Sequence, residues 1–284
     1  MNRLLLNPSA GTGRAARLPD LLRPFAKLDV RTPGSAAAVF DEARSAAAEG
    51  VDRLLVAGGD GTLHHAISGL AGSNCALGVV PFGSGNDLAR ALGVPLDPLR
   101  AARQALEASP RRIDLGRIDG RPFAGVASLG FDAEVARFAR DHVRTHRGRW
   151  IYPYAVARTL LTFRPFSVRI DLEEQRYEGR VMLVAVANSP FYGGGMRIAP
   201  AAQLDDDWLD LVIIEQVPRA RFLMLFPRVY RGAHVDDSAV RVLRTRRATL
   251  QFDRSLSVFA DGEPFGACST AQAEIWPAAL RVVA

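Results

Sequence analysis

The chain has 284 residues, which is enough for two domains of roughly 150 residues each. Hydrophobic residues make up 48% and charged residues 23%, and 25 glycines with 17 prolines are too few for a low-complexity chain, so fibrous and disordered classes are excluded. The net charge is a modest +6, and Lys27 is the only lysine. Because Lys27 has neither a Gly-rich loop nor a kinase strand around it, P-loop and protein-kinase sites are also excluded.

The cysteine pattern and the length of the apolar runs indicate where in the cell the protein works. Cys75 and Cys268 belong to no metal-binding or disulfide pattern, which favours a reducing environment. The longest apolar runs, such as residues 181–187, are too short to span a membrane. We therefore expect a cytoplasmic protein with no transmembrane segment, either free or bound peripherally at the inner face of the membrane.

From residue 3 to about 110, short apolar runs alternate with amphipathic segments. The runs at 4–6, 54–57 and 77–80 are predicted to be buried strands. Between them, Ser35 is positioned to cap a helix that ends at Gly50, and Asp97 with Pro98 begins another. This alternation predicts an α/β nucleotide-binding domain with a parallel sheet over residues 1–115.

After about residue 111 the pattern changes to strand-like runs separated by turn residues. Helical segments interrupt these runs near 130–163 and 218–231. The pattern predicts that residues 116–284 form a mostly β, sandwich-like domain.

The segment VAGGDGTLHHAISGL, residues 56–70, leads a predicted strand through a glycine-rich turn into a helix. Glycines at such a turn let backbone N–H groups approach an anion, and the hydroxyl of Thr62 adds a donor. Asp60 would repel a bare phosphate, so we expect it to face a metal ion or to accept N–H bonds. An ordinary glycine-rich turn capped by aspartate is the alternative.

Two more glycine-containing turns, at 7–14 and 81–90, directly follow predicted strands of the same half. Ligands of open parallel sheets bind beyond the carboxyl ends of the strands, where the three turns would converge. The three turns together predict a shared nucleotide site.

In chain order, these motifs resemble the bacterial diacylglycerol kinase and sphingosine kinase family of lipid kinases. The resemblance rests first on NPSAGTGR, GGDGTL and PFGSGNDLAR. It continues through IDLG at 113–116, SLGFDAEVA at 128–136, NSPFYGGGMRIAP at 188–200, LDDDWLDL at 204–211 and DGEPFG at 261–266. The similarity therefore covers essentially the whole chain.

The resemblance implies a site for ATP and Mg²⁺. Glu263 would be the general base that takes the proton of the lipid hydroxyl, and Asp60 would act at the triphosphate. The residues implied to hold ATP are Asn7, Thr32, Gly58, Gly59, Asp60, Gly61, Thr62 and Ser84. The metal ligands implied are Gln203, Asp206 and Trp208 for a structural magnesium, with Asp87 and Asp114 in a network near the catalytic one.

Some of these positions have simpler interpretations, and some depart from the family pattern. On the residues alone, Asp114 would be a solvated strand residue and Asp87 a helix cap. His64 and His65 occupy a segment that usually carries Asn-Glu, and Asp207 replaces a glycine beside Asp206. Adjacent histidines point about 100° apart on a helix and cannot chelate one zinc ion, so surface or site-lining roles are expected.

Residues 137–169 combine arginines with Trp150, Tyr152 and Tyr154. This composition suits an anionic membrane surface, with nucleic acid or a solvated helix face as alternatives. Because no nucleic-acid-binding motif is present, we expect a lipid partner and no nucleic acid, and a homodimer is left open.

The function predicted from the sequence is transfer of the ATP γ-phosphate to a lipid hydroxyl, that of diacylglycerol or a related lipid. Two alternatives stand beside it: a soluble-substrate kinase of the NAD kinase or phosphofructokinase type, which also uses a GGDG turn, and a lipid-sensing protein that has lost catalysis.

Overall fold

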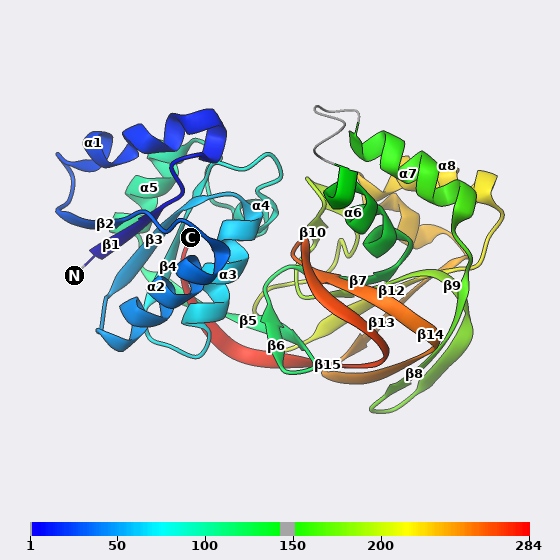
Figure 1. Ribbon diagram of the computed structural model, residues 1–284. Coiled ribbons are helices and arrows are strands. Elements are labelled where there is room, and N and C mark those ends of the chain that lie inside the picture. Colours follow the sequence, from blue (N-terminus) through cyan, green and yellow to red (C-terminus); the bar gives the residue numbers. More distant parts are fainter. Residues whose placement is uncertain (1, 143–150) are drawn as a thin grey trace.

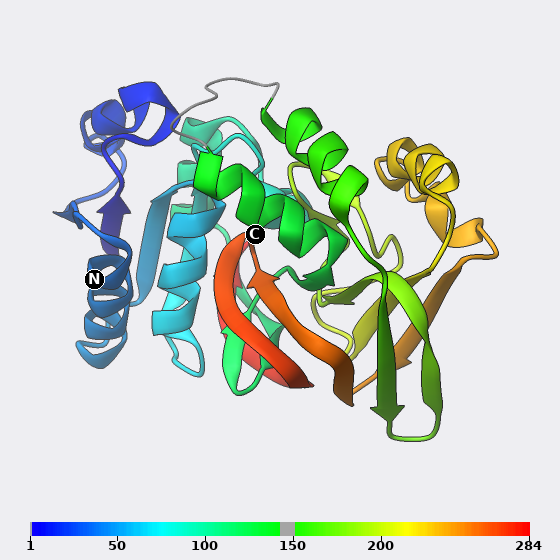
Figure 2. The same ribbon diagram turned by 45° about the vertical axis from the view of Figure 1, so that its right-hand side comes forward.

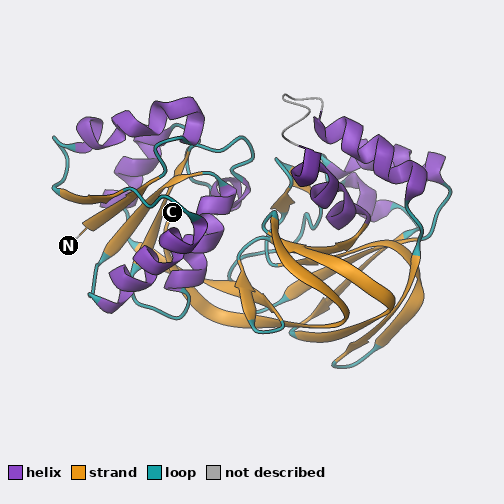
Figure 3. Ribbon diagram, in the orientation of Figure 1, coloured by secondary structure: helices purple, strands orange, loops and turns teal. Residues whose placement is uncertain are grey.

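A computed structural model describes residues 2–142 and 151–284 and shows two units joined by long strands (Figure 1). The first unit is built from strands and helices in alternation, and the second from long curved strands with helices above them (Figure 3). The elements of the first unit are β1 (Asn2–Leu6), η1 (Ala10–Arg17), α1 (Leu18–Leu22), β2 (Leu28–Arg31), α2 (Ala36–Ala48), β3 (Arg53–Gly58), α3 (Asp60–Leu70), β4 (Ala76–Pro81), α4 (Asp87–Leu92) and α5 (Pro98–Glu107).

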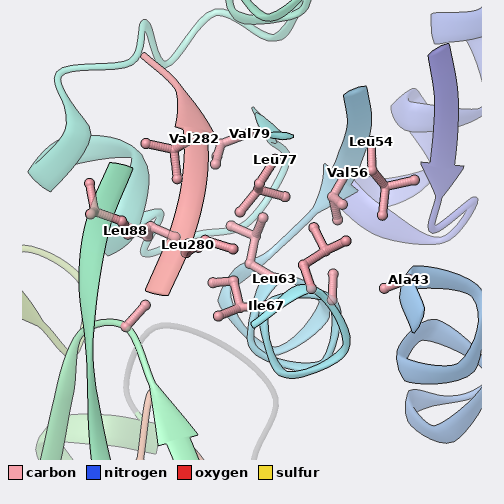
Figure 4. Packing of buried hydrophobic residues seen from close by; sticks show 14 of the residues in the cluster. Ala43, Leu54, Val56, Leu63, Ile67, Leu77, Val79, Leu88, Leu280 and Val282 are labelled. Carbon is pink, nitrogen blue, oxygen red and sulfur yellow. The ribbon is translucent and has the colours of Figure 1, made fainter. Parts of the chain in front are cut away.

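The strands of the first unit pair in parallel in the order β2, β1, β3, β4. Alternate side chains face opposite layers of helices, as a strand period of two requires. Leu54 and Val56 pack with Leu63 and Ile67 of α3 (Figure 4), whereas Leu55 lies in the cluster on the other face with residues of α1 and α5. Burial on both faces explains why these strands are uninterrupted apolar runs.

Two helices of this unit begin where the sequence predicted. The Ser35 side chain accepts a hydrogen bond from the N–H of Ala38, and the Asp97 side chain accepts one from the N–H of Arg100. Pro98 then occupies the first turn of α5, where a missing N–H costs nothing. The edge strand β2 was not predicted, because its LDVR sequence alternates apolar and polar residues over four positions only, too short a run to stand out.

The second unit contains the remaining strands and helices. Its elements are β5 (Pro110–Ile118), β6 (Arg121–Phe123), β7 (Val126–Gly130), α6 (Phe131–His142), α7 (Ile151–Thr162), β8 (Phe166–Leu172), β9 (Arg176–Ala187), β10 (Phe191–Tyr192), β11 (Met196–Arg197), β12 (Leu209–Glu215), α8 (Arg219–Val229), η2 (Ala233–Asp236), β13 (Val240–Thr245), β14 (Arg247–Ala260) and β15 (Glu263–Val283). Helices α6 and α8 contribute to one apolar cluster with β7, β9 and β12, and a second cluster lies among the strands.

The two units share one sheet. β15 has 21 residues, pairs antiparallel with β14 and β5, and then pairs in parallel with β4 through Arg281–Val283 (Figure 2). The mostly β character of the second half was predicted correctly. The strands predicted within residues 1–115 do pair in parallel, as β2, β1, β3 and β4, but the 13-stranded sheet to which they belong continues into the second unit and is mostly antiparallel. The boundary between 115 and 116 stays a prediction.

No helix within the described ranges is long and apolar enough to cross a membrane. The helical segment predicted near 130–163 is represented by α6 and α7, while Trp150 of the arginine and aromatic region lies outside the described residues.

Candidate active site

The turn between β3 and α3 holds the Asp60 carboxylate in a fixed orientation. Its Oδ2 accepts a hydrogen bond from the N–H of Asn86, and its Oδ1 accepts one from the N–H of Asp87, both at 2.9 Å. The carboxylate therefore ties the GGDG turn to the turn after β4. This outcome matches the expectation that Asp60 accepts backbone N–H bonds.

The two turns touch through their glycines. A Cβ on Gly83 would lie 2.8 Å from the Cα of Gly59, and one on Gly85 would lie 2.7 Å from the Asp60 Oδ2. Both distances are shorter than real Cβ contacts, so a side chain at either position would push the turns apart. The glycines are required for close packing as well as for the phosphate access predicted from the sequence.

Asp87 connects the first unit to the second. Its carboxylate accepts hydrogen bonds from the N–H groups of Gly194 and Gly195, at 2.8 and 2.7 Å, in the YGGGM segment between β10 and β11. Burial raises the pKa of Asp60, and the nearby Asp87 charge raises it further, against the lowering effect of the two N–H bonds. In the part of the chain that the structure describes, no side-chain cation forms an ion pair with either of these two neighbouring carboxylates.

The remaining predicted ATP residues lie at the same edge of the sheet. The Asn7 Nδ2 donates to the Thr62 Oγ1 at 3.4 Å, which joins the first turn to the second. Thr32 is exposed just beyond the end of β2, and Ser84 is exposed in the turn after β4. Since β2, β1, β3 and β4 are parallel, their carboxyl ends bring all three turns and Thr32 to one edge.

Glu263 begins β15 and lies over the GGDG turn. A Cβ on Gly61 would be only 2.7 Å from its Oε1, so the carboxylate is in close contact with the turn. Its Oε2 is 3.3 Å from the Arg140 Nη1 of α6, and the side chain is 26% exposed. The structure therefore brings Glu263 and Asp60 to neighbouring positions from opposite ends of the chain.

His64 fixes the turn that carries Glu263. Its ring is buried, and its Nδ1 lies 3.1 Å from the Asp261 Oδ2. Asp261 also accepts the N–H groups of Ala124 and Gly125, at 2.9 and 2.8 Å. The departure from the family pattern at His64 is thus a link between the units, which sequence reasoning missed because its partner is 197 positions away.

A cleft of about 490 Å³ lies between the two units. Its polar lining includes Asp60, Ser84, Asp87 and His64, and Asp132 contributes from α6. The apolar part of its lining includes Leu63, Ile67, Leu88, Val126, Tyr192 and Phe259. Such a cleft can hold a charged phosphate group at one side and an apolar molecule at the other.

Asp60 and Asp87 are the carboxylates of the cleft that could bind a metal ion. Mg²⁺ binds through one or two carboxylates together with substrate phosphates, and the mutually repelling Asp60 and Asp87 fit that description. Among the described residues, no group of three or more acidic, histidine or cysteine side chains could hold an ion alone. A magnesium ion here would therefore depend on phosphate oxygens from ATP.

Asp114 and the loop at 203–208 have different surroundings. The Asp114 carboxylate accepts the N–H groups of Asp207 and Ala278, at 2.8 and 2.7 Å, and within the described chain no contact joins it to Asp60 or Asp87. Asp206 accepts the N–H of Trp208 and pairs with the guanidinium of Arg244. The Asp206 carboxylate differs from those of Asp60 and Asp87 in that a cationic side chain already balances its charge.

Comparisons with known proteins extend over both units. The family model for the diacylglycerol kinase catalytic domain matches residues 2–118, and that for the YegS C-terminal NAD kinase beta sandwich-like domain matches residues 125–284. A diacylglycerol kinase from Bacillus subtilis (strain 168) is 30% identical over 269 residues, covering 92% of this chain and 89% of that protein. One from Mycobacterium tuberculosis (strain CDC 1551 / Oshkosh) is 35% identical over 246 residues, covering 84% and 79%.

Solved structures share the fold. A crystal structure of a protein from Bacillus anthracis str. Sterne superimposes with a TM-score of 0.83 at 22% identity, covering 99% of this chain and 94% of that one. An NAD kinase from Archaeoglobus fulgidus, solved in complex with ATP, gives 0.55 at 12% identity, covering 100% and 94%. Because matches at 30% identity and above extend through both units, the chain belongs to the diacylglycerol kinase family and is a lipid kinase.

Proposed function

We propose that this lipid kinase transfers the γ-phosphate of ATP to the free hydroxyl of diacylglycerol. Use of ATP follows from the family, and diacylglycerol is the acceptor named for the relatives from Bacillus subtilis and Mycobacterium tuberculosis. The observation that carries the proposal is the position of Glu263, whose carboxylate lies against the GGDG turn and directly follows Asp261 and Gly262 of the cleft lining.

ATP is proposed to bind at the edge of the sheet where the three turns meet. Backbone N–H groups of Gly58, Gly59 and Gly61, with the Thr62 hydroxyl, would donate to phosphate oxygens at the start of α3. Asn7, Thr32 and Ser84 would supply further polar contacts around the nucleotide. With no lysine nearby, Mg²⁺ held by Asp60 and Asp87 would supply the charge compensation of phosphoryl transfer.

Glu263 is proposed to accept the proton of the lipid hydroxyl. As the hydroxyl oxygen forms its bond to the γ-phosphorus, the bond from that phosphorus to the bridging oxygen breaks and ADP leaves. The ion pair with Arg140 restrains the Glu263 carboxylate, and the link between His64 and Asp261 fixes its turn. General-base assistance of this kind is typically worth about 10² to 10⁴ in rate.

The second proposed metal position, at Gln203, Asp206 and Trp208, has less support. A structural cation would have to compete with Arg244 for the Asp206 carboxylate. Asp114 supports this loop through the N–H of Asp207, so we assign it a structural role instead of a place in the catalytic network.

We also propose that the enzyme works in the cytoplasm and contacts the inner face of the membrane through the outer faces of α7 and α8. Leu161 and Met224 there are 68% and 67% exposed, and Leu223 and Tyr230 are about half exposed. The exposed Arg158 lies on the same helix as Leu161. Apolar side chains beside a cation suit an anionic lipid surface. A homodimer stays a prediction, which the mass of the protein in solution would test.

The direct test supplies labelled ATP and Mg²⁺ with vesicles containing diacylglycerol, a sphingoid base or phosphatidylglycerol as the hydroxyl acceptor. We expect label in the chloroform-soluble product with diacylglycerol and none with Glu263→Gln. Label transferred to another lipid alone would show that the acceptor is wrong. Binding of diacylglycerol without any transfer would favour a lipid-sensing role.

A further inference from the structure

Asp132 is a buried carboxyl group that the proposed mechanism does not use. It is the second residue of α6, is only 8% exposed, and follows Phe131 of the apolar cluster beneath the helices. Its Oδ1 accepts the N–H of Ala133 at 2.9 Å, while its Oδ2 is buried and has no hydrogen-bond partner among the described residues. A buried polar atom without a hydrogen-bond partner costs free energy of folding. We therefore expect a ligand to supply the missing partner of the Asp132 Oδ2.

The surroundings of Asp132 favour its uncharged form. No arginine, lysine or histidine within the described chain forms an ion pair with it. Burial raises the pKa of Asp132 to about 7, against the smaller lowering effects of the Ser128 hydroxyl and nearby backbone N–H groups. A protonated carboxyl is a hydrogen-bond donor, whereas an ionised carboxylate only accepts hydrogen bonds.

Asp132 also lies where a polar region meets an apolar one. It lines the interdomain cleft together with Asp60 and Asp87. It lines as well a second, smaller cavity of about 20 Å³, whose other walls are apolar side chains of α6 and α8 with neighbouring strands. Only Asp132 and Tyr192 line both spaces. A molecule reaching from the phosphate side of the cleft towards the apolar side would pass this carboxyl.

The chemistry of the acceptor matches a donor at that point. Diacylglycerol has one hydroxyl, which is consumed in the reaction, and its two ester groups offer only acceptor oxygens. We propose, resting on the lipid kinase function above, that the Asp132 carboxyl donates a hydrogen bond from its Oδ2 to an ester carbonyl of the lipid acceptor and so selects ester-linked lipids. The acyl chains then lie against the apolar side chains that line the larger cleft, such as Leu63, Ile67 and Val126.

This arrangement distinguishes diacylglycerol from a sphingoid base. A sphingoid base carries an ammonium group, which would be paired with an ionised carboxylate. An uncharged donor gains nothing from the ammonium group, and a buried ammonium beside it would lack a counter-charge. The structure therefore assigns Asp132 as a specificity residue that contacts the lipid away from the reacting hydroxyl.

The test compares Asp132→Leu, Asp132→Asn and, as a matched control on the exposed side of the same helix, Asp141→Asn. Steady-state kinetics with dioctanoylglycerol give the KM for the lipid and for ATP separately. We expect Asp132→Leu to raise the lipid KM about tenfold, the effect of roughly one hydrogen bond, with the ATP KM unchanged. Asp132→Asn keeps an N–H donor and should stay within about threefold of wild type.

Equilibrium binding of dioctanoylglycerol without ATP separates failure of this inference from failure of the proposed function. If the wild type binds the lipid but transfers no phosphate, the proposed function fails, and weaker binding by Asp132→Leu would still support the subsite. If the wild type transfers phosphate and Asp132→Leu binds normally, the subsite alone is refuted. Tighter binding of a sphingoid base than of dioctanoylglycerol would also overturn it, as would equal impairment of the Leu and Asn variants.

Discussion

The interdomain cleft and the loop at 203–208 both carry aspartates from motifs of the same family, yet their electrostatic environments are opposite. In the cleft, Asp60 and Asp87 lie close together, their hydrogen-bond partners in the described part of the chain are backbone N–H groups, and the pKa of Asp60 is raised. In the loop, Asp206 is paired with Arg244. Charge left unbalanced by the protein is expected where a ligand supplies the balance, whereas charge already balanced is expected to serve the fold.

Among variants that test this comparison, we expect the largest loss of activity from a substitution at Glu263, which lies against the GGDG turn. Glu263→Gln keeps the shape of the side chain but cannot take the proton, so kcat should fall by about 10² to 10⁴ with the ATP KM little changed. Steady-state kinetics of the purified variant measure both. If instead the melting temperature drops and the folded fraction keeps normal kcat, Glu263 only supports its turn.

Asp60→Asn is the second test of the cleft. Loss of the carboxylate removes a proposed magnesium ligand, and we expect phosphoryl transfer to fall by about 10² to 10³, similar to loss of one strong transition-state contact. Asn keeps one of the two acceptor oxygens for the backbone N–H groups, and its substitution also removes the repulsion with Asp87, so the melting temperature should change by only a few degrees. A variant with activity within tenfold of wild type would place Asp60 outside the mechanism.

The pH dependence of stability tests the unpaired carboxyl at Asp132. Its pKa is raised from 3.8 to about 7 on folding, so the folded state binds the proton more tightly and loses stability as pH rises from about 4 to 7. Asp132→Asn does not titrate. Its stability relative to wild type should therefore increase over that window by a few kcal/mol and level off above pH 7, as measured by denaturant unfolding at each pH. A constant difference across the window would contradict the burial argument.

The smallest effect is expected in the loop at 203–208. Since Arg244 balances Asp206, Mg²⁺ without ATP should leave the melting temperature of the wild type unchanged. Arg244→Gln should lower it by no more than a few degrees, because a partly exposed ion pair is worth about 1 kcal/mol or less.

Arg244→Gln also tests whether Mg²⁺ can bind at Asp206. Mg²⁺ should stabilise Arg244→Gln if the metal and the arginine compete for Asp206. A wild type that is stabilised by Mg²⁺ alone, with Arg244→Gln stabilised no further, would restore a structural metal to this loop and erase the contrast with the cleft.

Local signals in the sequence predicted much of the nucleotide edge. The glycine turns follow apolar strands, and the caps at Ser35 and Asp97 form within four residues of their partners, so short-range chemistry decides them. The sequence predicted that Asp60 would accept backbone N–H bonds, but it did not identify Asn86 as a donor. The lipid kinase function depended on the family resemblance as well as on these turns.

The remaining features depend on contacts between distant residues. The contact of Arg140 with Glu263 spans 123 positions, and the motif around Asp132 indicates a strand leading into a helix without showing that its carboxyl is buried. The contact of Asp114 with Ala278 spans 164 positions, so its support of the loop at 203–208 could not be read from the sequence. No periodicity within a segment encodes such pairings.

The return of β15 to β4 has a consequence for how the protein folds. The bond from the Arg281 Nη1 to the Asn74 carbonyl joins residues 207 positions apart, and Val282 fills the same core as Leu77. Closing so large a loop is slow, because the entropy lost by the chain is not offset until both ends have met. The nucleotide edge can therefore reach full order only after the whole β-rich region has formed, so the two units should unfold together in a single cooperative transition.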